Sequence, residues 1–362
     1  METKSRTSRI FRFAGLASIL ALGATTFWVS RPFVDRSLGG AHPVAFEPAQ
    51  PMIDSDTRAD LNDFFLNEAK GTDAFVILKD GALFYEFGAT DVPSNLHSGR
   101  KSLISLLFGI AAEKGLVDPD ATLADLGIDE TQKPLTDTEK TATVAHLLQA
   151  KSGVYLASGA ETQDMKDGRP TRGQFQPGEN YYYNNWDFNV LGAIFEQQSG
   201  LSIGQALDDW LGRPLGMQDF HASHVIYDSD TATTDFRTYR IHMSARDLAK
   251  IGLLVQQGGL WDGAQIVPAD WIARTTQATS AIQTRAYDGY GYLWWMNSDR
   301  DVIAADGWGG QYLHIDRSGP YVLVNRQDTG NSKLGYLRFV WPNHRDDPLD
   351  VFTAHDILTG QK

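Results

Sequence analysis

The 362-residue sequence contains no cysteine. The chain therefore has no thiol nucleophile, no disulfide framework, no thiolate metal site and no cysteine for a lipid anchor. Positively charged residues are also outnumbered, because the chain has 32 Lys and Arg residues and 45 Asp and Glu residues, which gives a net charge of −13. A nucleic-acid-binding surface needs a basic stripe, and none is present, so we do not expect nucleic acid as a partner.

The composition is that of a folded protein. Hydrophobic residues make up 42% of the chain and aromatic residues 11%, which is enough to build a core in one large domain or two modest ones. Disorder is excluded on this composition. We find no internal repeat at the periods that mark solenoids or propellers.

The N-terminal segment is predicted to be an export signal. Three arginines within the first twelve residues precede an apolar run over residues 13–30, and this order is typical of a signal peptide or an N-terminal membrane anchor. We expect the protein to be periplasmic, or anchored to the inner membrane facing the periplasm, with membrane contact only through residues 1–30. Cleavage is left open. Residues 31–55, rich in Pro, Gly and Asp, are predicted to be a linker.

Residues 56–362 are predicted to form one intertwined α/β body. An amphipathic pattern predicts a helix over residues 58–70, and "AFVILKDGALFYEFG" alternates and turns at Asp80-Gly81, a strong hairpin signal. The middle of the chain, from Ser98 to about Ala273, is mostly helical pattern broken by loops. Strand-like segments return near the end, as "GYGYLWWM", "DVIAAD", "QYLHID" and "YVLVN".

The stretch "HSGRKSLISLLFGIAAEKGL", residues 97–116, places a serine and a lysine at the head of an apolar helix. Residues three apart share one helix face, so Lys101 can lie beside the Ser98 hydroxyl. A lysine desolvated by apolar neighbours has a lowered pKa and can take the serine proton. The alternative is structural, with Ser98 as an N-cap and Lys101 solvated in the first turn.

A second stretch, "PGENYYYNNWDFNVLGAIFEQQSG", has tyrosine and asparagine two residues apart before a helical pattern. A phenol near the serine can relay protons, and an asparagine can orient the lysine. The residues alone leave the register open, because Tyr182-Asn184 and Tyr183-Asn185 both fit. An aromatic loop before a helix is the alternative interpretation.

The third stretch is "DGWGGQYLHID", residues 306–316. A glycine-rich backbone leading into a strand lets a substrate approach closely, and a strand-edge N–H can serve an oxyanion hole. A plain hairpin turn is the alternative.

Together the three stretches resemble the serine hydrolases of the β-lactamase and penicillin-binding-protein superfamily, in particular its class C and esterase-like branch, which includes aminohexanoate-oligomer hydrolases. The resemblance extends over roughly residues 58–340 and includes "TVAHLLQAKSGV", "HMSARDLAKIGLLVQQGGLWDGAQIVPADWI" and "GYGYLWWM". It implies a β-lactamase-like fold, with an antiparallel sheet flanked by helices and a mainly helical insertion at roughly residues 118–245. It also implies catalysis without metal or cofactor.

The resemblance assigns roles to the residues of the first two stretches. Ser98 would be the acyl-enzyme nucleophile and Lys101 its general base. The family's spacing selects Tyr183 and Asn185 over the alternative register.

The third stretch would supply the remaining part of the site. Trp308, Gly309 and Gly310 would form the family's third box, and the backbone N–H groups of Ser98 and Gln311 would form the oxyanion hole. Trp308 departs from the family, because relatives that recognise a carboxylate usually have Lys there, and some have His.

This departure favours a serine hydrolase of carboxylic esters or small amides as the function, with a small ester, amide or peptide-like molecule as the partner. An indole offers an apolar wall and one N–H donor instead of a positive charge. A β-lactamase or D-alanyl-D-alanine carboxypeptidase is the alternative, with Arg240 or Arg285 supplying the missing charge. A degenerate binding or sensing homologue is the second alternative. The paired histidines His221 and His224 lack a carboxylate partner, and we predict no zinc site there. The oligomeric state is left open.

Overall fold

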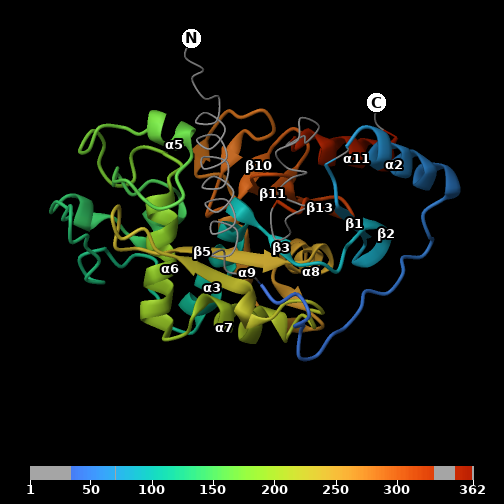
Figure 1. Cartoon of the computed structure of the whole chain (residues 1–362), viewed down its shortest axis with the longest axis horizontal. Coiled ribbons are helices and arrows are strands. Elements are labelled where there is room, and N and C mark those ends of the chain that lie inside the picture. The colour runs from blue at the N-terminus through green and yellow to red at the C-terminus, as the bar shows by residue number, and fades with distance from the viewer. Residues whose placement is uncertain (1–33, 70, 330–346, 361–362) are drawn as a thin grey trace, which may run out of the picture. The chain divides into compact units, whose positions relative to one another are not determined.

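The computed structural model describes residues 34–69, 71–329 and 347–360, so the predicted export signal lies outside the described residues. No helix within these ranges is long and apolar enough to cross a membrane. From residue 35 onward the described chain belongs to one unit. A large sheet with helices on both faces occupies one side of it, and a mainly helical insertion occupies the other (Figure 1).

The large sheet has eight strands in the order β2-β1-β13-β12-β11-β10-β9-β8, and every neighbouring pair is antiparallel. Strands from the two chain ends meet inside it, since β1 pairs with β13. Its strands are β1 (Ala74–Lys79), β2 (Ala82–Gly88), β8 (Ser280–Ala281), β9 (Gly289–Tyr290), β10 (Trp295–Asn297), β11 (Val302–Gly307), β12 (Gln311–Asp316) and β13 (Tyr321–Arg326). The predicted α/β fold with a sheet built from both ends of the sequence is confirmed.

The hairpin predicted at Asp80-Gly81 is confirmed. Asp80 and Gly81 have φ angles of +51° and +82°. A two-residue type I′ turn requires positive φ angles at both of its central residues. The twist of this turn matches that of the paired strands β1 and β2.

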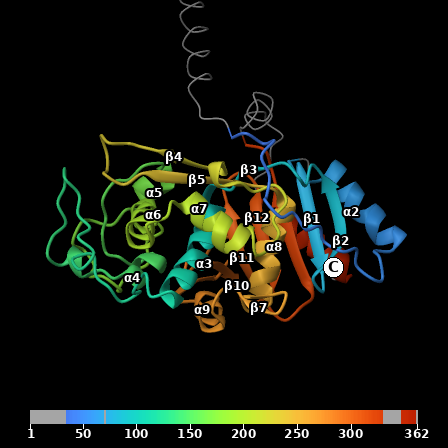
Figure 2. The same ribbon diagram turned by 90° about the horizontal axis from the view of Figure 1, so that it is seen from below.

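Helices cover both faces of the sheet. Helices α2 (Ser55–Asn67) and α11 (Leu349–Thr359) pack together on one face, over a core that includes Phe65, Phe75 and Leu323. Helix α8 (Ala245–Gln256) crosses the other face and packs on β1, β12 and β13 (Figure 2). The helix predicted over residues 58–70 corresponds to α2, which begins three residues earlier because Asp54 accepts bonds from two backbone N–H groups as its N-cap.

The site-bearing helix α3 (Arg100–Glu113) lies between the sheet and the insertion. A short 3₁₀ turn, η2 (His97–Gly99), precedes it and carries Ser98. The remaining elements are η3 (Glu139–Thr141), α4 (Val144–Leu148), α5 (Gln163–Asp167), α6 (Asn185–Ser199), α7 (Ile203–Leu207), η4 (Asp208–Gly212), η5 (Ala222–His224), α9 (Ala269–Thr275), the sheet β3 (Ser94–Asn95), β5 (Thr238–Met243), β4 (Val225–Asp228), and the hairpin β6 (Leu260–Trp261), β7 (Ala264–Gln265).

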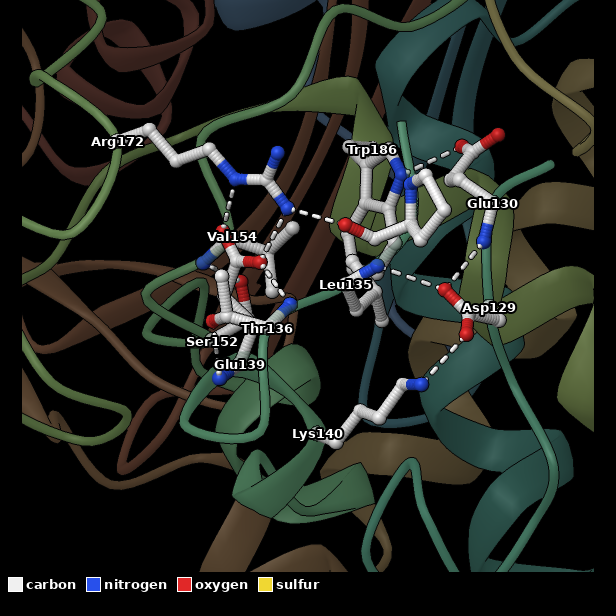
Figure 3. Close-up of polar contacts among 11 residues, drawn as sticks. Asp129, Glu130, Leu135, Thr136, Glu139, Lys140, Ser152, Val154, Arg172 and Trp186 are labelled. Carbon is white, nitrogen blue, oxygen red and sulfur yellow. Dashed lines mark hydrogen bonds and ion pairs between the residues drawn. The ribbon is translucent and has the colours of Figure 1, made fainter. Parts of the chain in front are cut away.

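Carboxylates hold the insertion's outer loop in place (Figure 3). Glu139 receives two bonds from the Arg172 guanidinium, at 2.8 and 2.6 Å. Glu130 accepts from the indole N–H of Trp186 at 2.8 Å. Because Trp186 lies in the first turn of α6, this bond ties the loop to the helix that follows the tyrosine–asparagine stretch.

Part of the segment predicted as a linker is hydrogen-bonded to the domain. Ala49 N donates to Leu83 O at 2.8 Å, and Val44 N donates to Gly216 O at 2.9 Å. The side chain of Lys250 on α8 donates to the carbonyls of both Val44 and Gly216. The segment is therefore held against the domain although most of it has no regular secondary structure.

Candidate active site

Ser98 and Lys101 face each other at the start of α3. Lys101 Nζ lies 2.7 Å from Ser98 Oγ and 2.6 Å from the hydroxyl of Tyr183, and it donates to both. The Lys101 side chain is almost fully buried, with 2% of its surface exposed. The alternative of a solvated lysine in a purely structural first turn is therefore wrong.

The surroundings of Lys101 disfavour its charged form. Burial lowers its pKa well below the usual value, the charge of the neighbouring Arg100 lowers it further, and Asp306 on β11 opposes them. The rings of Tyr183 and Phe188 lie 4.4 and 4.5 Å from Nζ. An amine kept neutral in this way can accept a proton from a hydroxyl.

The tyrosine register is decided by geometry. Tyr183 directs its hydroxyl to Lys101, and burial raises the pKa of that hydroxyl. The Tyr182 hydroxyl instead donates to Met165 O, away from Ser98. The structure thus brings Tyr183, not Tyr182, to the serine–lysine pair.

Neither Asn184 nor Asn185 bonds Lys101, although an asparagine was expected to orient this lysine. Asn184 is the N-cap of α6 and accepts from Asp187 N at 2.9 Å. Asn185 donates from Nδ2 to Ala160 O at 2.6 Å, and its buried Oδ1 has no hydrogen-bond partner. The hydrogen bonds of Lys101 go to Ser98 and Tyr183. Asn185 therefore lies in the second stretch as predicted, but it does not hold the lysine through a direct bond.

The glycine-rich stretch forms the turn between β11 and β12. Gly309 and Gly310 have φ angles of +77° and +78°, a region that favours glycine. A Cβ on Gly310 would lie 2.3 Å from the Gln327 side chain, so a larger residue would collide there. Trp308, at the tip, is 51% exposed, and its ring meets that of His97 edge to face at 5.2 Å.

The Gln311 side chain is buried and structural. Its Nε2 donates to Gly309 O and Gln327 O, both at 2.7 Å, and its Oε1 accepts from the buried Arg326 at 2.7 Å. These bonds hold the turn in shape. The Gln311 side chain is therefore engaged within the protein, and the oxyanion role of its backbone N–H stays a prediction.

Close packing brings this turn to the serine. A Cβ on Gly307 would lie 2.1 Å from Leu96 O, so only glycine lets the end of β11 approach the turn before α3 so closely. A Cβ on Gly99 would lie 3.8 Å from Gln311 O, which places the backbone of Gln311 next to the residue that follows Ser98. The three sequence stretches therefore meet at one place.

Aromatic rings surround the tyrosine of the site. Trp295 lies 5.3 Å from the ring of Tyr183, and Tyr290 lies 4.9 Å from that of Trp295. Trp295 is half-buried, whereas Trp186 is fully buried and faces Phe236 in the insertion. Of the aromatic residues near the motifs, some therefore line the site and others belong to the core.

Sequence reasoning missed three residues beside the site: Arg100, Asp306 and Gly307. Arg100 and Asp306 act on the pKa of Lys101 through their charge. In the sequence, Arg100 lies between Ser98 and Lys101, and Asp306 and Gly307 begin the third stretch. Their positions within the motifs are the feature from which a role near the site could have been predicted.

The arginines considered for binding a substrate carboxylate, and one of the two histidines considered for zinc, bond other groups of the protein. Arg240 pairs with Asp228, and Arg285 pairs with Asp347 at 3.0 Å. His224 bonds the Asp35 carbonyl at 2.9 Å. Within the described ranges, metal-ligating side chains nowhere gather in groups of three.

The sequence also contains one Gly-x-Ser-x-Gly pattern, residues 200–204, which marks the nucleophile elbow of α/β-hydrolases when it follows a strand. Here it follows helix α6, and Ser202 is the N-cap of α7, with its side chain accepting from Gln205 N. This serine is a helix cap.

Comparison with known proteins supports the same family. The Beta-lactamase family model matches residues 72–330. A 6-aminohexanoate-dimer hydrolase of Paenarthrobacter ureafaciens is 25% identical over 313 residues, which cover 76% of this chain and 78% of that protein.

Solved structures share the fold. A Bacillus anthracis protein proposed to be a 6-aminohexanoate-dimer hydrolase superposes with a TM-score of 0.62 at 18% identity, over 91% of this chain and 92% of that one. The octameric penicillin-binding protein homologue of Pyrococcus abyssi gives 0.59 at 18% identity, over 86% and 78%. From the match over residues 72–330 and this shared fold, the chain belongs to the Beta-lactamase family and is a serine hydrolase.

Proposed function

We propose that the protein hydrolyses carboxylic esters or small linear amides through an acyl-enzyme on Ser98. The observation that carries this proposal is the buried series of contacts from Ser98 Oγ to Lys101 Nζ to the Tyr183 hydroxyl. A serine hydroxyl becomes a nucleophile when a neighbouring base removes its proton, and a desolvated lysine is such a base.

In the proposed reaction Lys101 Nζ takes the Ser98 proton while Oγ bonds to the substrate's carbonyl carbon. The carbonyl oxygen becomes an anion and is received by the N–H groups of Ser98 and Gln311. The bond to the leaving group then breaks, and the leaving group takes a proton from the Tyr183 hydroxyl, which regains one from Lys101. Water then attacks the acyl carbon while Lys101 takes a proton from that water. The bond to Ser98 Oγ breaks, the acid is released, and Oγ regains its proton from Lys101.

The preference for substrates without a carboxylate beside the scissile bond rests on Trp308. An indole provides no positive charge for a substrate carboxylate, and Arg240 and Arg285 are each paired with an aspartate. Burying an anion without a partner costs several kcal/mol. Small amides are included because a relative is named for the hydrolysis of the 6-aminohexanoate dimer.

The decisive experiment measures adducts on the intact protein by mass spectrometry after exposure to a fluorophosphonate, a penicillin and a p-nitrophenyl ester. We expect one fluorophosphonate adduct, on Ser98, and ester turnover. Ser98→Ala should lose both while its thermal unfolding is unchanged. Wild-type ester hydrolysis by Ser98→Ala would refute the nucleophile.

Export remains part of the proposal and is supported by the apolar run behind three arginines. Since that run lies before the catalytic domain, a chain beginning at residue 31 should be soluble and fully active. Aggregation of this shortened chain, with normal folding of the full chain in detergent, would contradict the assignment.

A further inference from the structure

Arg100 is a buried arginine beside the candidate base. Its side chain is 5% exposed, and it forms no ion pair with any carboxylate of the described residues. NH1 donates to His97 O at 3.1 Å, NH2 donates to Asn189 Oδ1 at 3.5 Å, and Nε has no hydrogen-bond partner. The guanidinium carbon lies 4.7 Å from the centroid of the Tyr239 ring.

A buried cation without a carboxylate partner is costly, so its place beside the site calls for a reason. One reason is structural, because His97 has a φ angle of +47° and Arg100 bonds its carbonyl. A neutral donor such as glutamine offers an N–H for such a bond without burying a charge. The bond to His97 therefore does not explain why the residue is charged.

We propose that Arg100 is a positioning residue that acts through Lys101: its fixed charge disfavours a second positive charge on Lys101 and so keeps that amine able to accept the Ser98 proton. This inference rests on the proposed function and adds a residue that holds the base in its working protonation state.

The charges around Lys101 support this role. Arg100 and Lys101 are consecutive residues, and their side chains bond the neighbouring residues His97 and Ser98. Both side chains also approach α6, Arg100 at Asn189 and Lys101 at Phe188. The Arg100 guanidinium therefore opposes a charge on Lys101, and the Asp306 carboxylate on β11 acts in the opposite direction. The segment before α6 and α6 itself present the hydroxyl and ring of Tyr183 and the ring of Phe188. Salt screens buried charges only weakly, so the effect of Arg100 should persist at physiological ionic strength.

The test measures the rate at which a fluorophosphonate labels Ser98 from about pH 5 to about pH 10, read as intact mass. It also measures kcat/KM for a p-nitrophenyl ester over the same range. The variants are Arg100→Gln, which removes the charge, and Asn189→Asp, which places a carboxylate opposite the guanidinium. Arg240→Gln is the matched control, because it removes one positive charge from an exposed ion pair.

Because only the neutral amine is a base, the labelling rate rises with pH through the pKa of Lys101 and levels off above it. Arg100→Gln should move this rise to higher pH by one unit or more, which is about a tenfold loss on the acid side and little loss on the plateau. Asn189→Asp should produce a shift in the same direction. Arg240→Gln should keep the wild-type midpoint.

A uniform loss at every pH in Arg100→Gln would reduce Arg100 to a structural support, and an unchanged profile would remove any role; either overturns the inference. If circular dichroism shows that Arg100→Gln is unfolded, Asn189→Asp decides, since it retains Arg100. Absence of labelling of wild-type Ser98 at every pH would overturn the proposed function and, with it, this inference.

Discussion

Two buried lysines of this protein have opposite surroundings. Lys101 is 2% exposed and bonds two hydroxyls, those of Ser98 and Tyr183. Lys250 is 1% exposed and bonds two backbone carbonyls, those of Val44 and Gly216.

Burial lowers the pKa of both lysines, but the nearby charges differ. At Lys250 the Asp247 carboxylate, one turn earlier on α8, works against burial and favours the charged amine. At Lys101 the strongest nearby charge is the Arg100 guanidinium, which works in the same direction as burial. Burial alone therefore does not make a lysine a base.

The partners complete the difference. A hydroxyl can give up its proton to an amine, whereas a carbonyl oxygen can only accept a hydrogen bond. The contacts of Lys101 thus permit proton transfer, and those of Lys250 fasten the N-terminal segment to the domain.

Replacing the candidate base should separate the two lysines most strongly. Lys101→Ala should slow acylation by about 10²–10⁴, the usual contribution of a positioned base. Lys250→Met should keep near-wild-type acylation once folded. Stopped-flow or single-turnover kinetics with a p-nitrophenyl ester measures both. Equal losses in the two variants would show that burial, and not the partners, is what matters.

Trp308 should set the preference between esters and β-lactams. We expect the wild-type protein to hydrolyse p-nitrophenyl esters at least about a hundredfold faster than any β-lactam, because an unpartnered anion is poorly bound. A lysine introduced at position 308, unlike either buried lysine, should meet solvent. Trp308→Lys would place an ammonium where half of the side chain is exposed and solvent keeps it charged, so acylation by penicillin should rise. Comparable turnover of penicillin and ester by the wild-type protein would favour the β-lactamase alternative.

Removing one hydroxyl partner of Lys101 should have a smaller effect than removing the lysine. Tyr183→Phe deletes the proton relay and should lower kcat by at least about tenfold. Tyr182→Phe is the matched control, because its hydroxyl bonds Met165 O and its loss should leave kcat almost unchanged. The reverse ranking in steady-state ester hydrolysis would show that the register is wrong.

The smallest expected effect concerns stability. Lys250→Met removes two hydrogen bonds, those to the carbonyls of Val44 and Gly216. At about 0.5–1.5 kcal/mol for each bond, the free energy of unfolding should fall by about 1–3 kcal/mol. Urea unfolding followed by fluorescence measures the change. An unaltered midpoint and slope would mean that the contacts of Lys250 do not stabilise the domain.

Local pattern was sufficient to predict several features. The Ser98–Lys101 contact follows from helical spacing, and the Asp80-Gly81 hairpin follows from the backbone conformations those residues tolerate. The meeting of the three stretches at one place was expected from the family resemblance, and Gly307 makes it possible by allowing close backbone approach.

Side-chain direction was harder to predict. Asn185 was expected to orient the lysine, yet its amide bonds Ala160 O in a loop 25 residues earlier. Nothing in the spacing of Tyr183 and Asn185 indicates that this loop returns to α6. The orientation depends on long-range packing, which no short pattern encodes.

By itself the sequence determined the kind of chemistry, because serine, lysine and tyrosine are present at spacings that allow contact, while thiol chemistry is excluded. Only the tertiary structure decided which tyrosine reaches Lys101 and which of the two buried lysines meets hydroxyls. It also decided that Arg100 is buried without an ion pair to any carboxylate of the described residues. The physical reason is that a pKa depends on burial and on every charge nearby. Those neighbours come from segments as distant as residues 101, 183 and 306, which only folding brings together.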